Sequence, residues 1–115
     1  MRVPNAERAF IDIAKLQSYA RDPNHRVGRH KARLFPAMLG MRMADAESLR
    51  QILADSVQRN EAAPGQLDEH GQRYQVDFVL TWRGRQADVR SVWIIRSGED
   101  FPRLVTCYPL KDESQ

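Results

Sequence analysis

The stretch that decides the fold is YQVDFVLTW, residues 74–82. Large side chains such as Tyr74, Phe78 and Trp82 alternate with mostly smaller or polar ones, and a period of two is typical of a half-buried β-strand. Arg-Gly-Arg at residues 83–85 follows directly and favours a hairpin turn. The sequence therefore predicts a strand that returns on itself.

Working outward from this hairpin, the return strand is predicted over residues 86–96. Its centre, Val-Trp-Ile-Ile at residues 92–95, is continuously apolar, which is typical of a middle strand covered on both faces. Residues 97–102 read as the next turn, and residues 103–109 as a third strand. The last residues, 111–115, are expected to form a frayed tail.

The part of the chain before the sheet reads as helical. Asp12 is expected to cap a helix that reaches about residue 20, and a second helix is predicted within residues 28–40. Asp45 is expected to cap a third helix over residues 46–60. Residues 61–71, with one proline and two glycines, read as a polar connection into the sheet.

These elements predict one domain over residues 1–115 with an α+β fold. Helices within about residues 12–60 pack on a three- to four-stranded antiparallel meander within about residues 72–109. A chain of 115 residues can bury a core of its own without a disulfide or a metal ion.

Composition narrows the class of protein. The single cysteine, Cys107, cannot form an internal disulfide, and no apolar run approaches the ~20 residues that a membrane span requires. The N-terminal residues lack the apolar core of a signal peptide. We therefore expect a cytoplasmic protein that does not cross a membrane.

The net charge of +3 is modest, but the positive residues are unevenly distributed. Residues 21–42 contain one acid, Asp22, among several cations, and a positive patch there would attract a polyanion. His25 and His30 lie in the same stretch, and imidazole exchanges protons near neutral pH. A solvated helix face carrying a surface histidine is the alternative. The cations are Arg21, Arg26, Arg29, Lys31, Arg33 and Arg42.

The last strand offers a second candidate site. If Val105 and Cys107 face the core, Thr106 and Tyr108 face away from it. Two hydroxyls on that face could bind a phosphate together with an arginine of the neighbouring strand. The alternative is an ordinary half-buried strand, in which threonine and tyrosine are common. The arginines in question are Arg90 and Arg96, with Trp93 or Tyr74 to stack on a base, although a core role is favoured for both aromatic residues.

Several other chemistries are not indicated. The three histidines and the scattered acids do not have a metal-ligand spacing, and residues 68–70, Asp-Glu-His, form only a weak exception. Cys107 lies in an apolar strand and reads as a structural thiol. No glycine-rich phosphate loop is present. We expect neither a metal ion nor a cofactor.

Five segments of the sequence together resemble a known class of bacterial domain. They are Pro4-Asn5-Ala6-Glu7, Lys15-Leu16, His25, Gly28-Arg29-His30-Lys31-Ala32 and Pro102-Arg103-Leu104-Val105-Thr106-Cys107-Tyr108-Pro109. The pattern is similar to a small bacterial domain of unknown function and to the nuclease modules of bacterial polymorphic toxins that share the fold of barnase, EndoU, the tRNase colicins and RelE. Because the sequence starts at a methionine without a delivery region, a free-standing toxin or a domesticated relative is expected.

The resemblance implies a metal-independent endoribonuclease with RNA as substrate and a cognate antitoxin or immunity protein as partner. It implies His30 as general base or acid, with Lys31 and Arg96 as cations at the phosphate and its transition state. Thr106 and Tyr108 would donate hydrogen bonds to that phosphate. His25, Arg29, Arg33, Arg90 and Arg96 complete the expected substrate-binding set.

Two further functions remain open at this stage. One is a non-catalytic protein-binding module, an immunity- or antitoxin-like partner that uses the sheet face, with Trp82, Trp93 and Tyr108 as interface anchors. The other is a homodimer built on the apolar centre of the second strand, residues 92–95.

Overall fold

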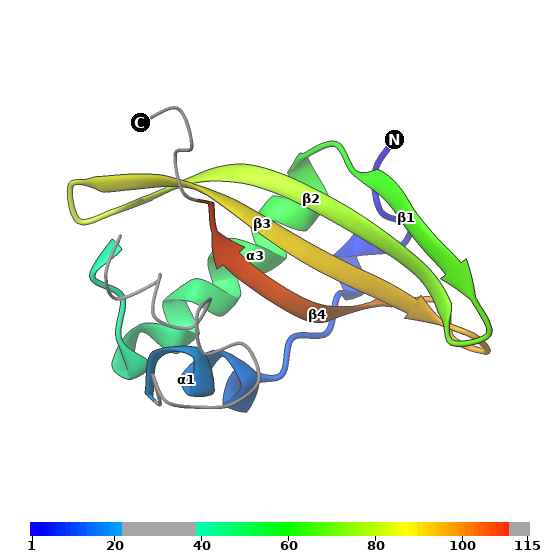
Figure 1. Cartoon of the computed structure of the whole chain (residues 1–115), viewed down its shortest axis with the longest axis horizontal. Helices are drawn as coiled ribbons and strands as arrows, with labels where there is room; N and C mark the ends of the chain where they lie inside the picture. Colours follow the sequence, from blue (N-terminus) through cyan, green and yellow to red (C-terminus); the bar gives the residue numbers. More distant parts are fainter. Residues whose placement is uncertain (22–38, 111–115) are drawn as a thin grey trace.

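The computed structural model describes residues 1–21 and 39–110 of the chain (Figure 1). The second expected helix, over residues 28–40, falls almost entirely outside the described residues. The helices that are described are α1 (Ile13–Arg21) and α3 (Ala46–Arg59), with short 3-10 turns at Ala6–Arg8 and Met43–Asp45. Both helix predictions, for residues 12–20 and 46–60, are confirmed.

The helix starts differ in how they are capped. The Asp12 carboxylate accepts a hydrogen bond from the Ala14 N–H at 3.0 Å, as expected for the residue before α1. Asp45 stands at the N-cap position of α3, as expected, but its side chain makes no cap hydrogen bond to α3. Asp45 is also the last residue of the preceding 3-10 turn, and its carboxylate accepts a hydrogen bond from the Arg42 N–H at the start of that turn, at 3.0 Å.

The sheet has four antiparallel strands in the order β1-β2-β3-β4, which confirms an α+β fold with a meander. The strands are β1 (Ala63–Asp68), β2 (Gly71–Trp82), β3 (Arg85–Arg96) and β4 (Pro102–Pro109). The expectation that residues 61–71 form only a connection is wrong. β1 lies there as an edge strand, which tolerates the proline and glycine that disguised it.

The hairpin between β2 and β3 is tighter than the predicted three-residue turn. Trp82 pairs with Arg85, so only Arg83 and Gly84 form the turn. Both have positive φ, 47° and 84°, as a two-residue turn of this kind requires, and glycine adopts that conformation without strain.

The core lies between the sheet and the helices. α3 contributes Leu53 and Val57, and the sheet contributes Val76, Val89 and Trp93, all essentially inaccessible to solvent. Figure 1 shows α3 behind one face of the sheet. Among the described elements no helix covers the opposite face, which we call the open face. No described helix is long and apolar enough to span a bilayer.

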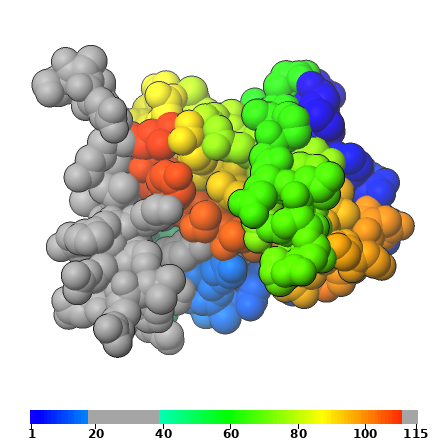
Figure 2. Space-filling model, turned by 45° about the vertical axis from the view of Figure 1, so that its right-hand side comes forward, coloured from blue at the N-terminus to red at the C-terminus, as the bar shows by residue number. Residues whose placement is uncertain are grey.

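The N-terminal residues pack along β4. Phe10 forms a parallel bridge with Arg103, its N–H donates to the Pro102 carbonyl at 2.8 Å, and the Lys15 ammonium of α1 donates to the Val105 carbonyl at 2.8 Å. Figure 2 shows α1, in light blue, beside the orange residues of β4 at the surface. These contacts hold the β4 edge of the sheet against the N-terminal segment.

Candidate functional site on the open face of the sheet

The register of the strands decides which side chains share the open face. Tyr108 pairs with Arg90, and Arg90 pairs with Asp77. Directly opposite residues of an antiparallel ladder project from the same face. Their neighbours Ser91 and Cys107 are buried on the helix side, so the Asp77–Arg90–Tyr108 row lies on the open face.

Within this row the Arg90 guanidinium is fixed by Asp77. Arg90 Nε donates to one carboxylate oxygen of Asp77 and Nη2 to the other, each at 3.0 Å. Such a bidentate pair is among the stronger and more directional side-chain contacts. The Asp77 hydrogen bonds raise the pKa of the Arg90 guanidinium, and Tyr108 contributes in the same direction. The row therefore presents an oriented cation beside a phenol.

Thr106 stands in the next row along β4, opposite Val92 of β3. It is half-buried and projects from the open face, as Tyr108 does, so the structure brings Thr106, Tyr108 and Arg90 together. The prediction that Val105 and Cys107 face the core is confirmed for Cys107 and wrong for Val105. The register shifts between Val92 and Trp93, and Leu104 takes the buried position while Val105 is half-buried.

Arg96 is not part of this group. It pairs with Gly71 at the far end of β3, six residues beyond Arg90, which is about 20 Å along a strand. A single phosphate bound at Thr106 and Tyr108 would be out of reach of Arg96. The structure therefore separates Arg96 from the other sheet residues expected in the substrate-binding set.

The remaining predicted site residues fall in the part of the chain that is not described. They are His25, Arg29, His30, Lys31 and Arg33. The basic stretch expected to bind a polyanion stays a prediction.

The open face carries balanced charge. Three arginines that the register places there each form an ion pair with a carboxylate of a neighbouring strand or turn. Such a pair lowers the affinity of the cation for an incoming anion, because the carboxylate already occupies its donors. The pairs are Arg73 with Asp68 (3.2 Å), Arg90 with Asp77 (3.0 Å) and Arg103 with Glu99 (2.9 Å).

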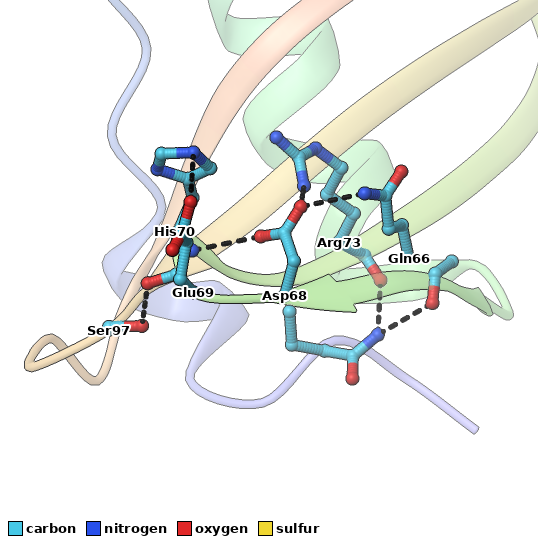
Figure 3. A network of polar contacts seen from close by, with 8 residues as sticks. Gln66, Asp68, Glu69, His70, Arg73 and Ser97 are labelled. Carbon is cyan, nitrogen blue, oxygen red and sulfur yellow. Dashed lines mark hydrogen bonds and ion pairs between the residues drawn. The ribbon is translucent and has the colours of Figure 1, made fainter.

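The Asp-Glu-His segment at residues 68–70 comprises the last residue of β1 and the two-residue turn into β2 (Figure 3). Asp68 accepts hydrogen bonds from the His70 N–H at 2.9 Å, from Arg73 Nη1 at 3.2 Å and from Gln66 Nε2 at 2.7 Å. The His70 N–H bond is the main reason that the pKa of Asp68 is lowered. Asp68 thus stabilises the turn. Within residues 1–21 and 39–110, no three His, Cys, Asp or Glu side chains are grouped to hold a metal ion.

The aromatic and sulfur candidates belong mainly to the core. Trp93 is 0% exposed and Tyr74 is buried, so the core role favoured for both is correct and neither is placed to stack on a base. Trp93 is equally unsuited to anchor a partner protein. At the centre of β3 Trp93 and Ile94 are buried and Val92 and Ile95 are half-buried, and a homodimer built there stays a prediction. Burial raises the pKa of the Cys107 thiol well above its ordinary value, as a structural thiol requires.

Two charged residues of the open face, Asp77 in the site and Arg103 outside it, were not among the residues predicted from the sequence. Asp77 is the polar member of the alternation in β2, and only the strand register shows that it lies opposite Arg90. The Arg103 guanidinium lies over the rings of Phe10 and Phe101, at 5.2 and 4.9 Å from their centroids. Phe10 approaches it from a segment that carries no strand pattern.

Comparison with known proteins places the chain in a family and identifies a structural relative. No curated protein matches the chain significantly. One chain of a contact-dependent growth inhibition toxin–immunity protein complex from Klebsiella pneumoniae 342 is similar, with a TM-score of 0.65 and 14% sequence identity. The similarity covers 87% of this chain and 98% of that chain, and at this identity it establishes a shared fold alone. A family model covers residues 2–111, and the chain therefore belongs to the DUF6883 family, a domain of unknown function.

Proposed function

We propose that this chain is a toxin-like endoribonuclease domain whose substrate lies on the open face of the sheet. One observation carries the proposal: Arg90, Tyr108 and Thr106, from two adjacent strands, meet on the face that no described helix covers. The shared fold with a chain of a toxin–immunity protein complex supports involvement in a toxin system. The basic, histidine-containing stretch of the sequence supports RNA as the polyanion.

The proposed reaction is an internal phosphoryl transfer. The ribose 2′-oxygen forms a bond to the adjacent phosphorus and the bond from phosphorus to the 5′-oxygen breaks, which leaves a 2′,3′-cyclic phosphate and a 5′-hydroxyl. His30 would take the 2′ proton or supply the proton to the leaving oxygen. Lys31 would balance charge that develops on the phosphate, and the hydroxyls of Thr106 and Tyr108 would donate hydrogen bonds to its oxygens.

Arg90 would act mainly by positioning in this scheme. Asp77 takes the Nε N–H and one of the two N–H groups of Nη2, so the second N–H of Nη2 and both N–H groups of Nη1 can approach Tyr108 or a phosphate. Asp77 thereby sets the plane of the guanidinium beside the phenol. The proposed role of Asp77 is to hold Arg90 in place, and the positive charge that attracts RNA is assigned to the stretch over residues 21–42.

The test uses the purified chain, a structured RNA and an excess of chelator. The wild type is expected to cleave the RNA and to leave a 2′,3′-cyclic phosphate, and RNA with a 2′-deoxyribose at the cleaved position is expected to resist. His30→Ala and Thr106→Ala should each lose activity while keeping the circular dichroism spectrum of the wild type. Unchanged cleavage by both variants would refute the assignment.

A specific observation favours a second function, a non-catalytic protein-binding module. Three arginines of the open face, Arg73, Arg90 and Arg103, are each held by a carboxylate, and arginine is enriched at protein interfaces. Expression in a bacterial host separates the two functions. A ribonuclease toxin should arrest growth and His30→Ala should relieve the arrest, whereas a binding module should leave growth unchanged.

A further inference from the structure

Part of β2 lies at an edge of the sheet that no other described strand covers. β1 pairs with β2 only as far as Ala63 opposite Gln75, and β2 continues to Trp82. Within the described residues no strand pairs with residues 76–82 on the side away from β3. An edge of this length offers a row of backbone donors and acceptors to another strand. We call residues 76–82 the β2 edge.

The direction of the backbone groups follows from one hydrogen bond. The Leu110 N–H donates to the Asp88 carbonyl at 2.7 Å, so Asp88 turns its backbone groups towards β4. Directions alternate along a strand, so Val89 turns its groups towards β2, where it pairs with Phe78. By the same alternation, Asp77, Val79 and Thr81 turn their N–H and C=O groups out of the sheet.

The side chains at the β2 edge are suited to contact. Val79 is 55% exposed on the open face, which is unusual for a valine in the middle of a strand. On the helix side a groove of about 510 Å³ runs between the edge and α3, lined by Ile52, Phe78 and Trp82 among others. Trp82 Nε1 is buried there without a hydrogen-bond partner among the described residues.

We propose that the β2 edge is a self-association surface, on which a second copy of this chain adds its own β2 edge in antiparallel orientation. With a two-fold axis at Val79, each Val79 lies opposite its counterpart and each Asp77 lies opposite a Thr81. These are the residues whose backbone groups point outward, so all of them are paired in the same register. The two four-stranded sheets become continuous, and both helix layers stay on one side.

The side chains and charges of the β2 edge match their own copy. Val79 covers Val79, and Asp77 meets a threonine and no second acid, so like charges are not opposed. On the helix side, half-buried Phe78 of one copy lies opposite Leu80 of the other copy, at the groove that Leu80 helps to line. At the ends of the edge, exposed Arg83 of one copy approaches the start of β1 of the other, next to exposed Glu61.

Sedimentation equilibrium of the full chain from about 1 to 500 μM tests this, because a dimer must dissociate on dilution. The wild type should show a mass of two chains at high concentration. Val79→Pro removes one outward N–H and leaves the β2–β3 hydrogen bonds intact. Val79→Lys places charges across the two-fold axis. Each should raise the dissociation constant at least about tenfold, while Leu67→Lys, at an exposed apolar residue of β1, should not.

A cysteine variant gives an independent readout in the folded protein. Val79→Cys should form a disulfide between two chains under mild oxidation, because directly opposite residues of such a pair have Cα atoms about 5.5 Å apart. Leu67→Cys should not, and the native Cys107 is buried. A wild type that stays monomeric throughout, or Val79→Pro and Val79→Lys variants that dimerise as the wild type does, would overturn the proposal. Neither result depends on ribonuclease activity.

Discussion

Ser91 links two buried groups, and its replacement by alanine should destabilise the fold strongly. The Ser91 hydroxyl donates to the Val76 carbonyl at 2.8 Å and accepts from Trp93 Nε1 at 2.9 Å, and both Ser91 and Trp93 are 0% exposed. Ser91→Ala leaves the indole N–H buried without a partner. That costs about 1–3 kcal/mol, whereas the Val76 carbonyl keeps its place in the β2–β3 ladder. We expect a loss of about 2 kcal/mol.

Urea unfolding followed by tryptophan fluorescence measures this loss, and a melt should show a fall in Tm of about 6–12 °C for a domain of this size. Ser97→Ala is the matched control, because the Ser97 hydroxyl also donates to a carbonyl, that of Glu69 at 2.8 Å, but is exposed. Water replaces that bond, so the control should lose less than about 0.5 kcal/mol. Equal losses of unfolding free energy in Ser91→Ala and Ser97→Ala would refute the role of Ser91 as the buried partner of Trp93 Nε1. In a Trp93→Phe background the cost of Ser91→Ala should shrink, since no indole N–H is left unpaired.

Three further predictions concern backbone fit, acidity and thiol burial. Gly71→Ala should prevent stable folding or lower the urea midpoint severely, because an added Cβ would lie 2.2 Å from the Ile95 carbonyl oxygen. Gly98→Ala, where φ is 86° and no atom lies within 4 Å of the added Cβ, should cost only about 1 kcal/mol. Similar urea midpoints for the two variants would contradict this. The Arg103 guanidinium lowers the pKa of Glu99, so the stability from this pair is complete above about pH 5 and is lost as the pH falls through the lowered pKa. Between about pH 7 and 3 the urea midpoint of Glu99→Gln should therefore fall less than that of the wild type. Cys107 should resist iodoacetamide in the native protein at about pH 8 and react once urea unfolds it, because burial raises its thiol pKa; rapid native alkylation would show that β4 opens readily.

The parts of the fold that the sequence predicted well are those with strong periodicity. β2 and β3 alternate or are continuously apolar, and α3 carries a stripe of buried residues, so their bounds were close to those observed. β1 could not be found in this way, because all but its last residue are exposed and its Pro64-Gly65 pair resembles a turn. Its pairing comes from proximity to β2 after the tight turn at residues 69–70, and no pattern within β1 encodes it.

The site was partly predictable for the same physical reason. Alternation along a strand placed Thr106 and Tyr108 on one face, but it could not place β4 relative to β3. The register shift near Val92 moved Val105 off the core side, and the register put Arg96 at the far end of β3. Asp77 became recognisable as the partner of Arg90 only once two strands were aligned.

The rate of RNA cleavage by open-face variants decides whether the Asp77–Arg90–Tyr108 row and its neighbour Thr106 form a catalytic surface. With equal amounts of folded protein and chelator present, Tyr108→Phe and Thr106→Val should each slow cleavage about 100-fold, because each removes one hydrogen-bond donor to the phosphate. Thr81→Val makes the same change as Thr106→Val but lies on β2, away from the row, and should cleave at the wild-type rate. Wild-type rates in Tyr108→Phe and Thr106→Val, or no cleavage by the wild type itself, would contradict the proposed function.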